Sequence, residues 1–266
     1  MGSGLIRALM HGLCALWVAA PALVHAQSCT LQSPSHRVTV LELYTSEGCS
    51  SCPPADRWLS GLPHQGIGPQ SAILLAFHVD YWNRLGWPDR FSQARFSARQ
   101  QAIAARNRSR LVYTPQLVLD GRPLHPGGLP EDLGELLRAI NRNPAGAMIH
   151  ADILRQSGAL RVSVDAQLLD PKAEPSAELW LAAFENGLSS EVARGENAGA
   201  TLHHDFVVRE LLGPFPMRSD GHRHLEHDIA AAAQWSEANT GVAIFVQDRQ
   251  SGEILQAAAM LPVCHP

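Results

Sequence analysis

The chain has 266 residues, of which 45% are hydrophobic, and its formal net charge is −4. This length predicts one large domain or two ordinary ones, and the hydrophobic content excludes a largely disordered chain. The near-neutral charge argues against nucleic acid as the main partner.

Residues 1–26 have the pattern of a secretory signal peptide. Arg7 supplies a positive charge, an apolar stretch follows, and the small residue Ala26 ends a suitable cleavage site. The unbroken part of the apolar stretch is shorter than the roughly 20 residues that a membrane-spanning helix needs. We therefore expect a mature chain that begins at Gln27, spans no membrane, and is periplasmic or secreted. A lipid anchor on Cys14 is the alternative.

Four cysteines remain after cleavage, and an oxidising compartment would allow them to pair. Four cysteines permit three pairings. Cys49 and Cys52 form the local pair, which leaves Cys29 near one mature end and Cys264 near the other. We expect a structural disulfide between Cys29 and Cys264. The alternative is that both are free or bond to another chain.

Residues 27–143 alternate between strand and helix patterns. A β-branched apolar run over 38–44 predicts a strand, and residues 56–62 have apolar side chains at helical spacing. The nearly continuous apolar run over 71–80 is typical of a strand buried on both faces. The later patterns predict, in order, a helix over 89–107, an extended segment over 113–121 with an Asp-Gly turn, a short strand over 122–124 and a helix over 130–141.

Cys49 and Cys52 lie at the predicted junction of the first strand and the first helix. Pro53 and Pro54 place the helix start close to them, because only the first helical turn tolerates residues without an N–H group. A helix N-terminus favours a thiolate through its free N–H groups and its dipole. We therefore assign Cys49 as the nucleophile and Cys52 as the resolving cysteine of thiol–disulfide exchange. The alternatives are an inert structural pair and a thiolate site for a soft metal ion.

Three features of residues 38–142 resemble a thioredoxin-like domain. They are the cysteine pair after the first strand, the Thr114-Pro115 step at the third core strand, and Asp120-Gly121 before the last helix. The resemblance implies an α/β thioredoxin-like fold with Pro115 cis beside the cysteines, and Thr114 offering its backbone to an extended substrate.

A wider set of residues resembles, more narrowly, the exported bacterial family catalogued as domain of unknown function 1223. The set comprises residues 44–49, 78–82 and 86–87. This resemblance extends over most of the mature chain. It implies a thioredoxin-like domain fused to a β-rich one, and it brings no substrate.

Residues 143–146 form a polar, proline- and glycine-containing boundary, after which the apolar period changes to two. Several short alternating strands at modest spacing predict that residues 144–266 form a smaller, mainly antiparallel β-sandwich domain. A short helix is expected over residues 229–235.

Asp80, Tyr81 and Trp82 follow the second predicted strand. Parallel strands bring their carboxyl ends together, so we expect these residues beside the cysteines, where ligand crevices lie in such sheets. Asp80 either accepts a proton from Cys52 or caps its loop. Tyr81 and Trp82 either wall a substrate crevice or pack into the core.

Other charged residues are expected to be structural. Glu47 either raises the pKa of Cys49 or is solvated, and the six arginines between residues 90 and 110 form a solvated helix face with its flank. The histidines at 203–204 and 222–227 fit surface or hydrogen-bonded roles better than a metal site. We expect no metal and no other cofactor, since the sequence also has no glycine-rich phosphate loop.

The sequence thus predicts an exported thiol–disulfide oxidoreductase that acts on thiols or disulfides of proteins or small molecules. The alternatives are a non-enzymatic binding module on a thioredoxin scaffold and a thiolate metal carrier. The Ser50-Ser51 dipeptide differs from the Gly-Pro of thioredoxins and the Pro-His of disulfide-forming oxidases. It therefore assigns neither an oxidising nor a reducing direction.

Overall fold

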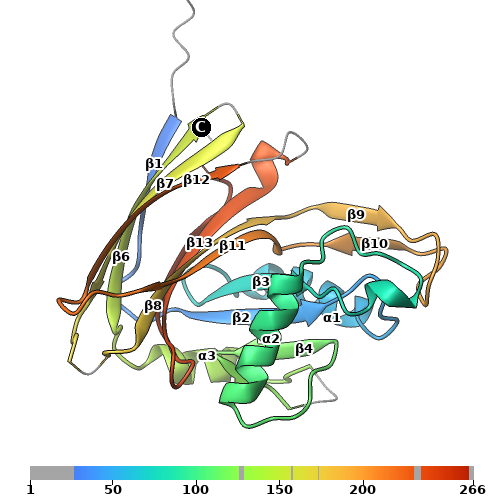
Figure 1. Ribbon diagram of the computed structural model, residues 1–266, viewed down its shortest axis with the longest axis horizontal. Helices are drawn as coiled ribbons and strands as arrows, with labels where there is room; N and C mark the ends of the chain where they lie inside the picture. The colour runs from blue at the N-terminus through green and yellow to red at the C-terminus, as the bar shows by residue number, and fades with distance from the viewer. Residues whose placement is uncertain (1–26, 126–128, 157, 173, 231–234, 264–266) are drawn as a thin grey trace, which may run out of the picture.

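The computed structural model describes residues 27–125, 129–156, 158–172, 174–230 and 235–263. The protein consists mainly of β-sheet with few helices, and most strand pairs are antiparallel (Figure 1). The predicted signal segment and Cys264 lie outside the described residues, so the Cys29–Cys264 bridge stays a prediction.

The larger sheet joins strands from both halves of the chain. Its strand order is β14-β13-β8-β11-β3-β2-β4-β5. The strands are β2 (Thr39–Thr45), β3 (Ala72–His78), β4 (Gln116–Leu119), β5 (Arg122–Pro123), β8 (Ala177–Glu185), β11 (Val207–Pro216), β13 (Thr240–Asp248) and β14 (Ile254–Met260). The central strand β3 pairs parallel with β2 and with β11. Its burial on both faces is what its continuous apolar sequence predicts.

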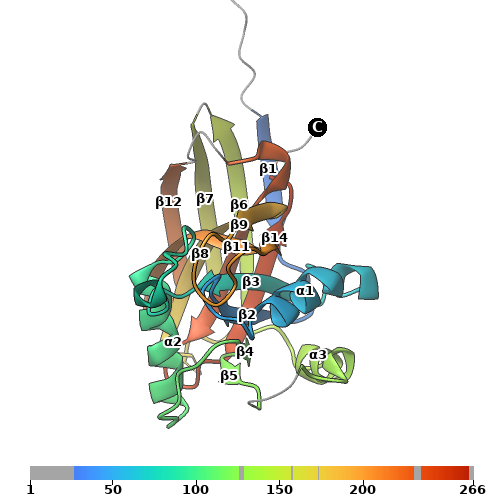
Figure 2. The same ribbon diagram turned by 90° about the vertical axis from the view of Figure 1, so that its right-hand side faces the viewer.

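Three helices cover the β3-β2-β4 end of this sheet. Helix α2 (Ala94–Arg106) lies on one face, while α1 (Pro53–Gly61) and α3 (Leu133–Asn141) lie on the other (Figure 2). From β2 to α3 the predicted order of strands and helices is confirmed, whereas β1 (Gln27–Gln32), which precedes them, was not predicted. Helix α1 begins three residues earlier than predicted because Pro53 and Pro54 occupy its first turn.

Helix α2 begins five residues later than predicted. Asp89 is the reason, because its carboxylate accepts the backbone N–H groups of Phe91 and Glu47 and holds the preceding segment as a loop. A short polar residue that bonds its own backbone two positions on favours a turn over a helix.

A second, antiparallel sheet has the order β1-β6-β7-β12. Its strands are β1 (Gln27–Gln32), β6 (Ala147–Gln156), β7 (Ala159–Leu168) and β12 (His222–Ala230). Its alternating apolar side chains form a core with those of β8, β13 and β14. The helix predicted from residue 229 is wrong at its start, because Ile229 continues β12 and is fully buried in this core. Residues 231–234 lie outside the described part of the chain.

Each of these two sheets contains strands from both sides of the domain boundary predicted near residue 143. Strand β1, which precedes the boundary, pairs with β6, and β11, which follows it, pairs with β3. The side chain of Arg37 adds a further link, since it bonds to Asp120 and to the carbonyl of Ile254. The predicted segments 27–143 and 144–266 therefore share sheet and core.

The arginines on and around α2 do not form a uniformly solvated face, and this prediction is wrong. Arg99 is buried and makes a bidentate ion pair with Glu42, which is also buried. Its guanidinium lies 4.7 Å from the ring centroid of Trp180 on β8. A planar cation that stacks on an aromatic ring can be buried at an interface between elements, which the helical spacing of arginines does not reveal.

Strands β9 (Leu188–Glu191) and β10 (Thr201–His204) form a separate two-stranded hairpin. We call residues 188–204 the hairpin strap. It extends away from the second sheet (β1-β6-β7-β12) and over the end of the large sheet where β2 leads into α1 (Figure 1).

Candidate functional site

Cys49 and Cys52 form a disulfide in the loop that joins β2 to α1. Cys52 immediately precedes the first residue of the helix, Pro53. Two backbone hydrogen bonds shape the loop, from Cys49 N–H to the carbonyl of Ser46 and from Cys52 N–H to the carbonyl of Cys49. A disulfide at a helix N-terminus is a position where a released thiolate would be stabilised by the helix dipole and by free N–H groups.

Both cysteines have an exposed fraction of 0%. The two serines between them are exposed. The loop therefore presents its backbone and hydroxyl groups to solvent while its sulfur atoms are covered.

Trp82 and Thr114 lie next to this loop. The indole N–H of Trp82 donates a hydrogen bond of 2.8 Å to the Thr114 hydroxyl. A Cβ atom placed on Gly48 would lie 3.4 Å from Cβ of Trp82, so the tryptophan packs directly against the residue before Cys49. The Thr114–Pro115 peptide bond is cis, as the resemblance implies.

The side chains of Asp80 and Tyr81 both form a hydrogen bond with α2. The Asp80 carboxylate accepts a hydrogen bond from the Ser97 hydroxyl, and the Tyr81 hydroxyl bonds to Gln100. Two roles were considered for Asp80, and these contacts favour the one in which it caps its loop. Its role as proton acceptor for Cys52 stays a prediction.

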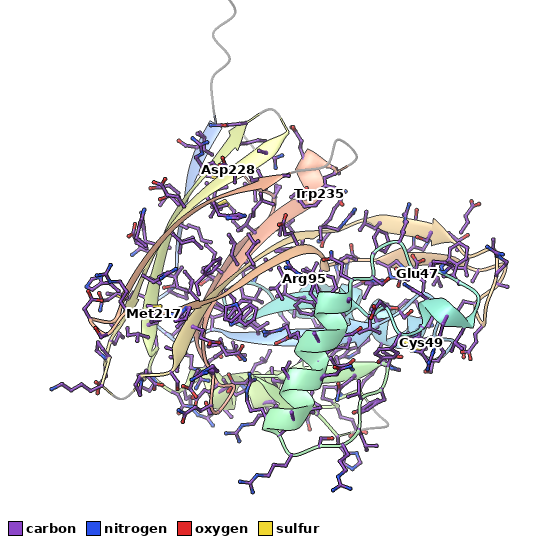
Figure 3. The ribbon with its side chains drawn as sticks, in the orientation of Figure 1. Glu47, Cys49, Arg95, Met217, Asp228 and Trp235 are labelled. Carbon is purple, nitrogen blue, oxygen red and sulfur yellow. A yellow bond between two sulfur atoms is a disulfide. The ribbon has the colours of Figure 1, made fainter. Side chains whose placement is uncertain are left out.

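The hairpin strap covers the cysteine loop through two side chains. The amide of Asn197 donates to the carbonyl oxygens of Glu47 and Cys49, at 2.9 and 3.0 Å. The carboxylate of Glu196 accepts hydrogen bonds from the Ser50 backbone N–H and hydroxyl, at 3.0 and 2.7 Å. The proximity of Glu47 and Cys49 to the strap is visible in Figure 3.

A cluster of buried ionisable side chains lies where the base of the strap meets the large sheet, and none of them is more than 6% exposed. Its members are Glu47, Asp56, His78, Asp89 and His204. The closest contact is between Nδ1 of His78 and the Asp89 carboxylate, at 2.6 Å. The His204 ring packs edge-on against the His78 ring, with 4.9 Å between centroids.

The remaining contacts of the cluster link it to the cysteine loop. The Glu47 carboxylate lies 3.5 Å from Nε2 of His204 and accepts a hydrogen bond of 2.7 Å from the Trp87 indole. Asp56 accepts a hydrogen bond from the Thr45 hydroxyl and lies 4.0 Å from Nδ1 of His204. The expectation that Glu47 is solvated is therefore wrong, because an indole and an imidazole replace water around its carboxylate.

The pKa values in the cluster follow from burial and from these neighbours. Burial lowers the pKa of His78, but the carboxylates of Asp89, Asp56 and Glu47 together outweigh burial and hold that pKa above its ordinary value. Burial raises the pKa of Asp89, but His78, together with the backbone N–H groups of Glu47 and Phe91, outweighs burial and holds that pKa below its ordinary value. Burial raises the pKa of Asp56, and the neighbouring His204 and His78 only partly offset this effect. The cluster therefore combines a stable ion pair with a carboxyl group that binds its proton more tightly than usual.

The strap and the cluster contain residues that the sequence did not identify as functional. Glu196 and Asn197 stand in a glycine-containing loop almost 150 positions after the cysteines, and only tertiary structure brings them together. One indication of the cluster was present in the sequence, the His203-His204 pair, of which only one member belongs to it. His204 proved to be buried, whereas His203 is exposed.

The other histidine group lies on the outside of β12. His222 and His224 share an exposed face of that strand, and His224 pairs with Asp165 at 2.9 Å. Within the described residues, no set of three or more histidine, cysteine or acidic side chains is placed to hold a metal ion. In the same part of the chain, none of the helices has the length and apolar character needed to cross a membrane.

Solved structures with this fold exist. The crystal structure of protein AGR_C_4864 from Agrobacterium tumefaciens has a TM-score of 0.58 and 22% identity, covering 84% of this chain and 94% of that chain. HBP35 of Porphyromonas gingivalis has a TM-score of 0.63 and 13% identity, covering 86% of this chain and 76% of that chain. At these identities the likeness shows the fold alone. None of the curated proteins compared matches the chain.

One family model matches residues 40–247, and its description is protein of unknown function (DUF1223). The matched range begins in β2 and ends in β13, so it includes the cysteine loop, the buried cluster and the hairpin strap.

Proposed function

Because the chain belongs to the DUF1223 family, which is described as of unknown function, we propose its activity from its own geometry: thiol–disulfide exchange at Cys49 and Cys52 by an exported protein. The observation that carries the proposal is the disulfide between these two residues at the start of α1. An exported protein would work in a compartment where such a pair can cycle between disulfide and dithiol.

Part of this proposal is that residues 38–142 form a thioredoxin-like scaffold. Three observations support it. Strands β3, β2, β4 and β5 are adjacent in that order, helices lie on both faces of this part of the sheet, and the Thr114–Pro115 bond is cis. The remainder of the large sheet and the second sheet then extend this scaffold.

The exchange reaction needs a partner dithiol or disulfide. In the reducing half of the cycle, a thiolate of an external dithiol attacks Cys49 Sγ, the Cys49–Cys52 bond breaks, and Cys52 leaves as a thiolate that takes up a proton. The second thiol of the partner loses its proton and attacks the mixed disulfide, which releases Cys49 and an oxidised partner. Run in reverse, the same steps reduce a partner disulfide and re-form the Cys49–Cys52 bond. Thr114 would offer its backbone to the extended segment of a protein partner.

Replacement of the resolving cysteine tests the proposal. In a Cys52→Ser variant the mixed disulfide at Cys49 has no internal thiol to release it, so covalent complexes with partners should accumulate. Non-reducing electrophoresis followed by mass spectrometry of the exported fraction would identify them. The matched control is Cys49→Ser, which lacks the proposed nucleophile and should trap far less. If Cys52→Ser traps nothing, and the wild type neither oxidises any test dithiol nor reduces any test disulfide, the proposal is lost.

The complete burial of both sulfur atoms favours a second candidate, a binding module that keeps the disulfide only for stability. The two candidates differ in how the disulfide responds to a reductant. An exchange site should be reduced by dithiothreitol while the circular dichroism of the folded protein stays unchanged. A purely structural disulfide should be reduced only as fast as the fold opens.

A further inference from the structure

We propose that the hairpin strap is a gate over the disulfide: Glu196 and Asn197 hold it closed, and it must lift before a thiol can reach Cys49. This inference rests on the proposed function, because it concerns the regulation of the same site.

The first ground is the covering of the sulfur atoms. Cys49 and Cys52 have no exposed surface, although Ser50 and Ser51 between them are exposed. Attack on a disulfide requires the incoming sulfur to approach along the S–S axis, so access limits the rate of exchange. In the closed arrangement an external thiol has no path to Cys49 Sγ.

The second ground is that the strap occupies the hydrogen-bonding groups of the cysteine loop. Asn197 bonds to the carbonyls of Glu47 and Cys49, and Glu196 bonds to the N–H of Ser50. A segment of a partner protein that docks in extended form would need such backbone donors and acceptors. The strap therefore holds the place that a protein partner would take, and the partner class that fits is an extended, cysteine-containing peptide segment.

The third ground is the difference between the base and the tip of the strap. At the base, His204 is buried against His78, and the carbonyl of Ser189 accepts a hydrogen bond from Arg90. At the tip, Glu196 is exposed and Asn197 is partly exposed. The hydrogen bonds of Glu196 are exposed and those of Asn197 are partly buried. A hydrogen bond of this kind contributes little net stability, so the tip can open while the base stays packed.

The fourth ground is the charge of Glu196. Its carboxylate accepts hydrogen bonds from Ser50 near the N-terminus of α1, and these bonds hold the pKa of the Glu196 carboxyl below its ordinary value. A thiolate on Cys49 would be favoured by the same positive end of the helix. A closed strap therefore opposes both the approach of a thiol and the formation of the Cys49 thiolate.

The rate of reduction of the disulfide tests the gate directly. We would measure reduction of the oxidised full-length protein by excess dithiothreitol, with peptide mass spectrometry reporting the Cys49–Cys52 bond. A Glu196→Ala/Asn197→Ala double variant should be reduced about fivefold faster than wild type, because the hydrogen bonds that favour the closed state are removed. Thermal melts would verify that this variant is folded.

The matched control is Glu191→Ala. Glu191 is an exposed carboxylate on the same hairpin, paired in register with Thr201, and its side chain makes no hydrogen bond or ion pair with the described residues of the cysteine loop. Its removal should leave the reduction rate unchanged. A double variant that is reduced no faster than this control overturns the gate. Since the assay needs no natural partner, it can succeed or fail independently of the covalent trapping experiment with Cys52→Ser.

Discussion

At the scale of single residues, the ion pair of His78 and Asp89 gives the site a defined response to pH. His78 has a folded-state pKa above its ordinary 6.5, so its contribution to stability is full below that value and is lost as the pH rises through the folded pKa. Asp89 has a folded-state pKa below its ordinary 3.8, so its contribution is present above that value and is lost as the pH falls through the folded pKa. The pair therefore stabilises the fold most between pH 3.8 and pH 6.5, the ordinary pKa values of Asp89 and His78.

We expect Asp89→Asn to remove the pH dependence of stability that the His78–Asp89 ion pair contributes. The variant should lose about 2–4 kcal/mol of the free energy of unfolding near pH 5, because a buried His78 would lose its charged partner. The loss should be smaller near pH 8, where His78 binds its proton less in either protein. Urea denaturation at the two pH values measures both effects. An equal loss at both would show that the pair does not control the pH response.

The cysteine pair could be found from the sequence because the chemistry lies within four consecutive residues. Spacing, the two prolines and the apolar run before them identify a strand–helix junction without tertiary information. The residues that cover it could not be found in this way. Glu196 and Asn197 act through contacts between distant segments, and a Glu-Asn pair in a glycine-containing loop reads as an ordinary solvated turn.

At the scale of elements, the turn between β4 and β5 explains why a glycine is required at one position. Gly121 has φ of +71°, and a Cβ atom there would lie 2.0 Å from the carbonyl oxygen of Gly252, in the turn between β13 and β14. The Asp-Gly sequence predicted a hairpin turn, and the structure adds a close approach of two backbones. Such an approach joins elements from opposite halves of the chain.

Gly121→Ala should therefore destabilise the protein by more than its backbone angle alone requires. We expect a loss of about 3 kcal/mol or more, since a left-handed residue costs of order 1–3 kcal/mol before any clash with the facing backbone. Gly66→Ala is the matched control: its φ is +79° but nothing lies within 4 Å of the added Cβ. Chemical denaturation of both variants separates strain from clash, and equal losses would contradict the role of the Gly252 contact.

The strands of the second half could be recognised from alternation, since β6 and β7 alternate between buried and exposed positions along their length. The sheet to which each strand belongs could not be recognised from the sequence. Alternation shows that one face of a strand is buried, but it carries no information on which neighbour covers that face. The pairing of β11 with β3 is such a case, since β11 follows β3 by some 130 positions.

At the scale of the whole molecule, the Arg99–Glu42 pair links the two halves. Arg99 bonds to Glu42 on β2 and also to Gln247 on β13, and it stacks on Trp180 of β8. We expect Arg99→Met to cost about 3–5 kcal/mol of the free energy of unfolding, because Glu42 stays charged and buried with the Tyr44 hydroxyl but without its cationic partner. Chemical denaturation measures this loss.

Two further variants test the explanation. Adding Glu42→Gln to Arg99→Met should restore part of the loss, because the uncompensated buried charge is removed. Arg138→Met breaks the exposed pair between Arg138 and Glu135, and its effect should stay below about 1 kcal/mol. A double variant no more stable than Arg99→Met alone would show that packing against Trp180, and not charge, dominates.

The parallel pairing of β3 with β11 also limits how the protein can be divided. Every residue of β3 is buried, and its backbone bonds to β2 on one side and, at Ala76, to the Phe206–Val207 step on the other. A fragment that ends at residue 143 would lack β11 and would leave β3, which is apolar from Ala72 to Phe77, as an edge strand. Such edges pair with other chains and aggregate. We therefore expect the solubility of the cysteine-bearing segment to depend on β11, a strand that is synthesised after it.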